Sequence, residues 1–499
     1  MSRPVAKLVV VGRDAAAWLT ALGLQRAFGR TGLSVGVVEL ATTLSPVDAY
    51  VALPTLGGLH RLLGLKEREV LAAAQGVYVL GQRFVNWSGG QSGFVHAYDT
   101  QPMGVNNVEL AQYWIKARGE GMKVAFEDFS LGATMAKQGR LSLDAELADG
   151  FTRPAYGFHL DARAYVGLVK AHALRGGVKL LGDGLGEVHA DGERITAVET
   201  KAGERIEADL FVDATGMDAA LIRRLPGSDF ESWRAWLPCD RLLATSAPRL
   251  DPIPGFSQIA AFRAGWIGLY PLQRRTAVIA AYDSTQVDDG AVLEALPVLT
   301  GLKPQGEAIV SALEPGRRPR PWIGNCVAVG DAAISLEPLD AVQPHLIQAA
   351  LSLLISLFPV DAGDMAEGEA FNAAMDLNAR HVRDFQIAHY KLNQRRDDRF
   401  WNRAREAAVP ESLAYKLDLF AARGRVAVYD EEAFQPPNWT SIFLGHGLMP
   451  RDYDPLVDLL PPQDQVLQMQ RMLKFIAGEV SVMPTLQSQL PSADRGASS

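Results

Sequence analysis

The sequence predicts an α/β protein in which a parallel sheet with packed helices is joined to an antiparallel sheet and a C-terminal helical region. Three patterns predict this fold class. A strand–helix–strand unit opens the chain, alternating strand patterns occupy its middle, and a charged helical pattern runs from Glu367 to Arg423. The 499 residues are enough for one large domain or for two to three closely packed ones.

The composition narrows the class of protein. It is 48% hydrophobic and 21% charged, which is ordinary for a globular chain. A net charge of −8 argues against general binding to nucleic acids or anionic membranes. No apolar run reaches the roughly 20 residues of a membrane span, and no signal peptide is recognisable, so we expect a cytoplasmic protein. The two cysteines, Cys239 and Cys326, predict neither a metal cluster nor a disulfide framework.

The N-terminal unit has the pattern of a Rossmann-type dinucleotide-binding domain. Leu8–Val11 is an apolar strand, Ala15–Phe28 has helical periodicity, and Leu33–Leu40 is a second apolar strand. The turn at Gly12 would bind phosphates through free N–H groups and the helix dipole. Glu39 ends the second strand, where an acid takes the ribose hydroxyls; a solvated strand-end carboxylate is the alternative.

Two later strands end in similar turns. Residues 209–212 lead into Asp213-Ala-Thr-Gly216, and residues 326–329 lead into Gly330-Asp331, after which a helix is predicted over Leu346–Phe358. Turns of this kind recur as the later flavin-contacting turns of FAD monooxygenase-type folds. The sequence therefore predicts an FAD-binding, monooxygenase-like domain, with Asp213, Gly216, Gly330 and Asp331 at the cofactor.

The predicted organisation has three parts. Residues 1–360 form the FAD-binding region, interleaved with substrate-side segments at about 50–160 and 230–320. Strand patterns over Ile195–Glu207 and Ile259–Asp283 predict an antiparallel substrate-side sheet. Residues 361–486 form the helical region, and the Ser/Ala/Pro-rich residues 487–499 are predicted to be disordered.

The phosphate-binding fingerprint is altered. Of its three glycines only Gly12 is present, with Asp14 at the second position and Ala17, a mild change, at the third. A carboxylate ~4 Å from a phosphate charge costs ~4 kcal/mol at an effective dielectric of ~20, about three decades in affinity. Arg13 would offset part of this cost. We interpret Asp14 as a helix N-cap that fills the anion site with the protein's own carboxylate.

Beyond the cofactor turns, the sequence resembles the flavin-dependent tryptophan halogenases nearly from end to end. The resemblance rests on an ordered set of segments: Leu53-Pro54-Thr55-Leu56, Gly64–Glu69, Arg83-Phe84-Val85-Asn86-Trp87, Phe158–Ala162, Ala208–Asp213, Glu337-Pro338-Leu339, His345–Gln348, Arg383–Lys391, Phe400-Trp401 and Gly445–Pro450. The resemblance implies that a separate reductase supplies reduced FAD, that oxygen and halide yield hypohalous acid, and that a lysine delivers electrophilic halogen to an indole-like ring. A nearby glutamate polarises the donor or takes the ring proton.

The sequence departs from this family at the reacting positions. The family lysine falls on Val79, which has no amine, so we expect no halogenation by the lysine route. Arg83, four residues on, is basic in the family as well, and its guanidinium is a poor nucleophile. By the period of two, both side chains are expected on one strand face.

The proposed base and the halide loop are altered too. The family's Pro-Leu-Glu-Ser-Thr segment is Pro338-Leu-Asp340-Ala-Val342 here. Asp340 is one methylene shorter than glutamate and is either a catalytic carboxylate or a solvated or capping acid. A misplacement of about 1 Å can cost a catalytic group ~100-fold in rate. Pro344 has no N–H and is expected to stiffen the loop that should hold an anion.

The tryptophan barrier is also incomplete. The family's Trp-x-Trp-x-Ile-Pro reads Trp266-Ile-Gly268-Leu-Tyr270-Pro271. Gly268 removes an indole between the flavin and substrate regions, which either opens a path for direct oxygenation or leaves space for another side chain. By the resemblance, Trp266, Pro271 and His345 belong to the substrate region.

Two functions remain. The first is a divergent FAD-dependent halogenase or monooxygenase that acts on an aromatic small molecule. The second is a non-catalytic relative of the halogenases that binds a partner. Neither involves nucleic acid or membrane.

Overall fold

A six-stranded sheet forms the base of the molecule in the computed structural model, which describes residues 3–88, 93–99, 104, 108–143, 155–396 and 398–491. Its order is β20-β21-β12-β1-β2-β8, and every pair is parallel except β20–β21. These strands are β1 (Lys7–Gly12), β2 (Ser34–Glu39), β8 (Lys179–Asp183), β12 (Leu210–Ala214), β20 (Trp322–Ile323) and β21 (Cys326–Ala328). The apolar strands β1, β2 and β12 are buried along nearly their whole length, as expected for a sheet covered on both faces.

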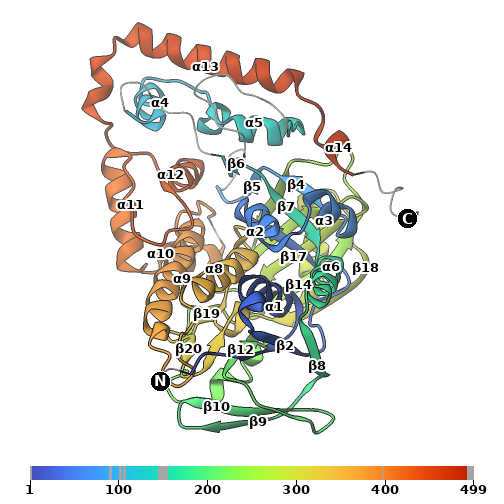
Figure 1. The fold of residues 1–499 in the computed structure, drawn as a ribbon. Helices are drawn as coiled ribbons and strands as arrows, with labels where there is room; N and C mark the ends of the chain where they lie inside the picture. The colour runs from blue at the N-terminus through green and yellow to red at the C-terminus, as the bar shows by residue number, and fades with distance from the viewer. Residues whose placement is uncertain are drawn as a thin grey trace.

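Helix α1 (Asp14–Phe28) packs on this sheet beside α6 (Ala162–Arg175) and α8 (Val342–Ser356). Its Ala/Leu-rich inner face and Trp18 are fully buried. The predicted strand–helix–strand unit is therefore confirmed, and the parallel sheet with its helices lies in the lower half of Figure 1.

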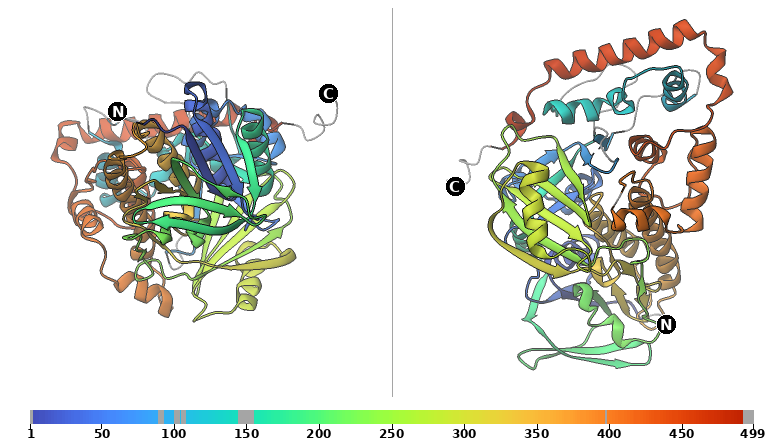
Figure 2. Two further views of the ribbon diagram at one scale, coloured as in Figure 1. Left: turned by 60° about the horizontal axis from the view of Figure 1, so that its bottom comes forward. Right: turned by 180° about the vertical axis from the view of Figure 1, so that it is seen from behind.

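The second large sheet has seven strands in the order β18-β14-β17-β16-β15-β5-β6. They are β5 (Gly81–Val85), β6 (Phe94–Ala97), β14 (Arg241–Ala247), β15 (Phe256–Phe262), β16 (Gly265–Pro271), β17 (Thr276–Tyr282) and β18 (Gln305–Ala312). The expected antiparallel pattern holds except for β15–β5, which pair in parallel. This sheet is visible from behind in Figure 2.

Three smaller sheets complete the strands. One contains β3 (Ala49–Ala52), β7 (Gly157–Asp161) and β4 (Val77–Val79); another contains β9 (Leu185–Asp191), β10 (Arg194–Thr200) and β11 (Arg205–Ile206); the third contains β13 (Glu231–Ser232), β19 (Gly316–Arg317) and β22 (Ile334–Ser335). The residues expected in the substrate-side sheet over 195–207 thus belong to a separate sheet, because β10 pairs with β9 and β11 instead.

The C-terminal part is helical, as predicted. It contains α9 (Glu367–Lys391), α10 (Arg399–Glu406), α11 (Glu411–Arg423), α12 (Pro436–Gly445) and α13 (Pro462–Val482). The remaining helices are α2 (Thr55–Leu63), α3 (Glu67–Ala73), α4 (Leu110–Gly119), α5 (Leu131–Gln138) and α7 (Asp289–Thr300). Helix α13 spans the top of Figure 1 and packs on α5.

The segment predicted to be disordered begins as ordered structure. Helix α14 (Leu486–Gln489) starts with a side-chain cap from Thr485 and buries Leu486 completely, which holds this stretch on the body of the protein. Residues 492–499 lie outside the described residues. Over the described ranges, no helix combines the length and the apolarity that a membrane crossing requires.

Candidate cofactor groove and reaction site

Three glycine turns lie at the ends of neighbouring parallel strands. A Cβ on Gly12 would lie 2.3 Å from the carbonyl oxygen of Ala214, so the approach of β1 to β12 admits only glycine. Gly216 and Gly330 have φ values of +74° and +61°, in the left-handed region that glycine adopts without strain. The sheet edge predicted to receive a dinucleotide is therefore built as expected.

Asp213 supports one of these turns. Its carboxylate is fully buried and accepts hydrogen bonds from the backbone N–H groups of Thr215, Leu221 and Ile222, at 2.8–3.0 Å, and from the Thr215 hydroxyl at 2.7 Å. With those contacts it positions the turn at Gly216 and does not line the pockets described below. Ala17, at the third fingerprint position, is likewise buried inside α1.

Asp14 is not the N-cap of α1. The N-cap is Arg13, whose side chain makes no capping hydrogen bond within the described residues, and Asp14 is the first helical residue, with φ +57°. Its carboxylate turns away from the helix and accepts hydrogen bonds from the Thr42 hydroxyl at 2.5 Å and from the Thr43 N–H and hydroxyl at 3.3 and 3.4 Å. The N-cap interpretation was wrong because the left-handed backbone points this side chain at the loop after β2. We call this set of contacts the Asp14–threonine bridge.

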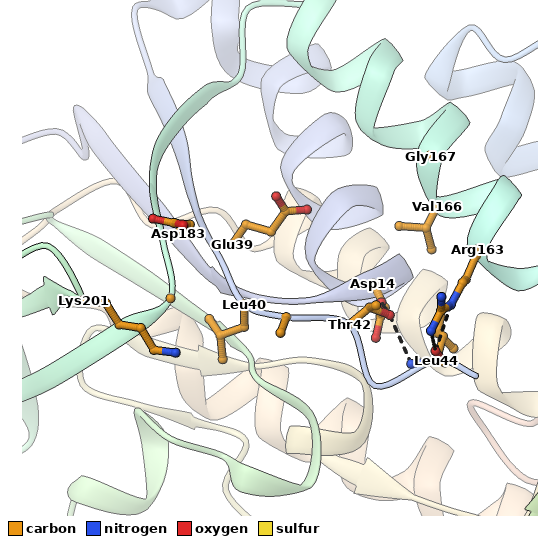
Figure 3. A pocket seen from close by; sticks show the side chains of 12 residues that line it. Asp14, Glu39, Leu40, Thr42, Leu44, Arg163, Val166, Gly167, Asp183 and Lys201 are labelled. Atoms are coloured by element: carbon orange, nitrogen blue, oxygen red, sulfur yellow. Dashed lines mark hydrogen bonds between the residues drawn. The ribbon is translucent and has the colours of Figure 1, made fainter. Parts of the chain in front are cut away.

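Two pockets meet at Asp14. The outer pocket has a volume of about 500 Å³ and is lined by Asp14, Glu39, Thr42, Arg163, Asp183 and Lys201, among others. Figure 3 shows Asp14 and Arg163 at one end, Asp183 and Lys201 at the other, and Glu39 and Leu40 between them. The inner pocket, of about 140 Å³, is lined by Arg13, Asp14, Tyr50, Gly216, Gly330, Asp331 and further side chains. Together they follow the three glycine turns.

Glu39 is held in place by two partners. It accepts hydrogen bonds from the Trp18 indole N–H at 3.1 Å and from the Lys170 ammonium at 2.6 Å. It is therefore a positioned strand-end carboxylate at the wall of the outer pocket, and not a freely solvated one.

Asp331 faces the inner pocket. Loss of hydration against the surrounding protein and repulsion from the nearby Asp14 carboxylate raise the pKa of Asp331 to about 6. Arg13, which was expected to offset part of this negative charge, instead forms an ion pair with Asp218 at 2.9 Å. The middle of the groove is therefore acidic.

Val79 is the last residue of β4 and is completely buried. The chain breaks register at Leu80, so that β4 joins the sheet of β3 and β7 while β5, with Arg83, joins the seven-stranded sheet. Val79 and Arg83 thus do not share one strand face, because one strand ends at Val79 and the next begins at Gly81 in a different sheet. Arg83 lies over the Phe256 ring at 5.8 Å.

Asp340 is buried in the turn before α8. Both Asp340 and Ala341 have φ +59°, and Asp340 Oδ1 lies 3.3 Å from His389 Nε2. His389 Nδ1 is in turn 2.8 Å from His446 Nε2, and Phe84 stacks on the His389 ring at 4.3 Å. The result is a buried carboxylate–imidazole–imidazole chain.

The capping alternative for Asp340 does not hold, because the N-cap of α8 is Ala341 and the Asp340 oxygens have no hydrogen-bond partner among the described residues. Pro344, expected in a loop, is the third residue of α8, where the missing N–H leaves no helical bond unmade. His345 lies on the same helix. Its two ring nitrogens are buried and unpartnered within the described structure, and burial lowers the pKa of His345 to about 4.

The tryptophan barrier is rebuilt with another side chain. A Cβ on Gly268 would lie 2.4 Å from the Tyr270 hydroxyl oxygen and 2.6 Å from its ring, so the phenol fills the space that the glycine leaves. The Tyr270 hydroxyl donates to the Pro338 carbonyl at 3.1 Å. Of the two interpretations of Gly268, the open path is excluded and the filled one holds. Pro271, at the end of the same strand, is also buried.

Trp266 ties the barrier to the Asp340 loop. Its indole N–H donates to the Glu337 carboxylate at 2.8 Å, and the Tyr390 hydroxyl donates to the same carboxylate at 2.6 Å. Glu337 is fully buried, and burial raises its pKa to about 7. These contacts join Trp266 in β16 and Tyr390 in α9 to the segment that contains Asp340.

Sequence reasoning assigned no role to four residues of this region, namely Glu337, His389, Tyr390 and His446. Each lies inside a segment that carries the family resemblance, at Glu337-Pro338-Leu339, Arg383–Lys391 or Gly445–Pro450. The sequence therefore contained a signal that could have identified these four residues. A buried polar side chain within an otherwise apolar helix, such as His389 in α9, would have singled these residues out.

The parallel sheet with its three glycine turns, the groove beside those turns and the adjoining antiparallel sheet define an α/β protein with the fold of the FAD-dependent monooxygenases. The tryptophan halogenase family model matches residues 7–462, and the chain belongs to that family.

Individual relatives agree. The chain is 28% identical to tryptophan 6-halogenase SttH of Streptomyces toxytricini over 91% of this chain and 92% of that protein. The structure of BrvH, a flavin-dependent halogenase from Brevundimonas, superposes with a TM-score of 0.90 at 32% identity, covering 97% of this chain and 98% of BrvH. Xcc4156, a flavin-dependent halogenase from Xanthomonas campestris, gives a TM-score of 0.92 at 29% identity, with the same coverage.

Proposed function

We propose that this chain binds FAD delivered reduced by a separate flavin reductase, and that it oxidises an aromatic small molecule without a lysine. The observation that carries the proposal is the Asp340–His389 pair. The buried Asp340 carboxyl group, whose two oxygens have no hydrogen-bond partner among the described residues, lies beside the barrier, and the His389 imidazole is 3.3 Å away. A buried polar group left without hydrogen bonds in this way is typical of a functional site.

The two ends of the groove have room and polar groups suited to FAD. Among the described residues nothing lies within 4 Å of a Cβ placed on Gly216, so a ligand has room there, and Glu39 stands at the wall of the outer pocket. Asp14 stands between the two pockets. Within the described structure its carboxylate is held by Thr42 and Thr43 alone, so the side chain can rotate away. Gly12, Gly216 and Gly330 would hold the dinucleotide. Bound reduced flavin would supply the electrons that turn oxygen into an oxidant.

The side chains around Asp340 then have separate tasks. Trp266 and Tyr270 keep the aromatic substrate apart from the cofactor. For the contact between His389 and His446 to be a hydrogen bond, one of the two nitrogens must carry a proton. When His446 donates, His389 keeps its proton on Nε2, facing Asp340. This orientation directs an N–H toward the Asp340 carboxyl group, which as a carboxylate can accept the proton that an aromatic ring loses on substitution.

The experiment is a product screen with FAD, a flavin reductase, oxygen and bromide, run on a panel of indoles and phenols and read by mass spectrometry. We expect a brominated or hydroxylated product from the natural chain. Asp340→Asn removes the charge and should abolish the product, whereas Asp340→Glu, which restores the family residue, should retain it. Product that survives in Asp340→Asn would refute the assigned role.

A second candidate is a non-catalytic protein that binds a partner. It is favoured by one observation, the carboxylate of Asp14 at the place of a pyrophosphate-binding glycine. This candidate predicts no saturable FAD binding up to about 1 mM and no product with any halide, and that outcome would refute the first proposal.

A further inference from the structure

The Asp14–threonine bridge divides the groove. Asp14 lines both the outer and the inner pocket, so a ligand that occupies both must pass this side chain. The backbone at Asp14 has the left-handed conformation that glycine adopts without strain. A glycine would leave the passage open, whereas here a carboxylate crosses it to Thr42 and Thr43.

The negative charges beside Asp14 are not neutralised by the two nearby arginines, Arg13 and Arg163. Asp14 and Asp331 both line the inner pocket, and neither forms an ion pair in the part of the chain that the structure describes. Arg13 is directed to Asp218, and the Arg163 guanidinium donates to the Leu44 carbonyl. The other titratable groups that face Asp14 are Asp48 and Tyr50, whose pKa values the Asp14 charge helps to raise.

We propose that Asp14 sets how tightly the groove binds nucleotides: it weakens the binding of the pyrophosphate of a dinucleotide, while the outer pocket admits a neutral nucleoside without that cost. The inference rests on the proposed FAD binding. A pyrophosphate entering the groove brings negative charge to within a few ångströms of the Asp14 and Asp331 carboxylates. Adenosine brings none, and the outer pocket of about 500 Å³ offers it Glu39 and Lys201 without crossing the bridge.

The size of the effect follows from Coulomb's law. Two unit charges ~6 Å apart at an effective dielectric of ~20 repel enough to change affinity on the order of 100-fold. Asp14→Asn removes the charge and keeps the shape and the contact with Thr42. Asp191→Asn is the control, because it removes an equal charge from an exposed residue at the end of β9 that lines neither pocket.

The experiment titrates the full-length protein and both variants with FAD, ADP and adenosine, by calorimetry for FAD and by ligand-detected NMR for the smaller probes. Melting temperatures establish that the variants are folded. We expect Asp14→Asn to bind FAD and ADP about 100-fold more tightly than the natural chain and to bind adenosine within about threefold of it. We expect Asp191→Asn to bind all three ligands within about threefold of the natural chain.

The outcomes are separable. If the natural chain binds FAD as tightly as Asp14→Asn, the inference is wrong and the proposed FAD binding stands. If neither binds FAD at about 1 mM, both are wrong. An equal gain for adenosine would also overturn the inference, because it would reflect a general opening of the pocket and not the exclusion of a pyrophosphate.

Discussion

The exchange of Gly268 for tryptophan, which restores the family pattern at this position, should damage the protein unless Tyr270 is exchanged as well. A Cβ at residue 268 would meet three atoms of the Tyr270 side chain at 2.4–2.8 Å. That ring is fully buried and its hydroxyl is bonded to Pro338, so it has no space into which to move. Inserting atoms into such a packed position costs about 1–3 kcal/mol even for small additions.

The partner exchange, Tyr270→Ile, removes the ring and leaves a cavity, and large-to-small exchanges in a core cost about 2–5 kcal/mol. In the double variant the indole at 268 occupies the cavity that the phenol leaves. The two changes should therefore be strongly non-additive, with a coupling of about 2–3 kcal/mol in favour of the double variant. For a chain of this length, 1 kcal/mol corresponds to a shift of roughly 1 °C in melting temperature.

The assay is thermal and urea unfolding of the natural chain, both single variants and the double variant, followed by circular dichroism and tryptophan fluorescence. Gly268→Ala serves as a smaller probe of the same clash. The reasoning is refuted if Gly268→Trp alone is as stable as the natural chain, or if the costs of the two single exchanges simply add.

Three further outcomes follow from the buried groups. Val79→Lys should lower the free energy of unfolding by about 3 kcal/mol relative to Val79→Met in urea unfolding, because it buries an ammonium in an apolar position. His389→Asn should cost about 1–3 kcal/mol by removing the imidazole beside the buried Asp340 carboxyl group. Asp340→Asn in the same chain should recover part of that loss, as a double-mutant cycle would measure. Glu337 has a pKa of about 7 in the folded protein. Because the pKa of Glu337 is higher in the folded protein than in the unfolded chain, protonated Glu337 stabilises the fold fully below about pH 4.3, and this stabilisation is lost as the pH rises to about 7. The loss is roughly 3 kcal/mol. Glu337→Gln should abolish it in unfolding experiments at pH 5 and pH 8.

The glycine turns and the strands before them were predictable because their causes are local. Gly12, Gly216 and Gly330 follow apolar strands directly, and a strand followed by glycine and a helix is a short-range pattern. The family resemblance added the order of the later elements. The turn of Asp14 toward Thr42 was not predictable, since it depends on a single positive φ angle.

The reaction region was less predictable because its contacts are long-range. Asp340, His389 and His446 meet only after the turn before α8, helix α9 and the end of α12 have packed together. The break at Leu80 was also hard to predict, because apolar residues run across it without a proline, although Gly81 marks the place. The filling of the Gly268 space by Tyr270 required knowing the rotamer of a side chain two residues away.

The three glycine turns also bear on biosynthesis. They come from residues 12, 216 and 330, so the groove does not exist until the last of them has left the ribosome. Strand β1 pairs with β2 and β12, so its second neighbour is made only when the ribosome reaches residue 214. The turn at Gly330 follows later still, after β21, which pairs with β12. At about 5–20 residues per second, roughly 320 residues of further synthesis take about 15 to 60 seconds. During that time an apolar strand is without its full sheet, so chaperone protection should matter more to this chain during synthesis than any bound nucleotide.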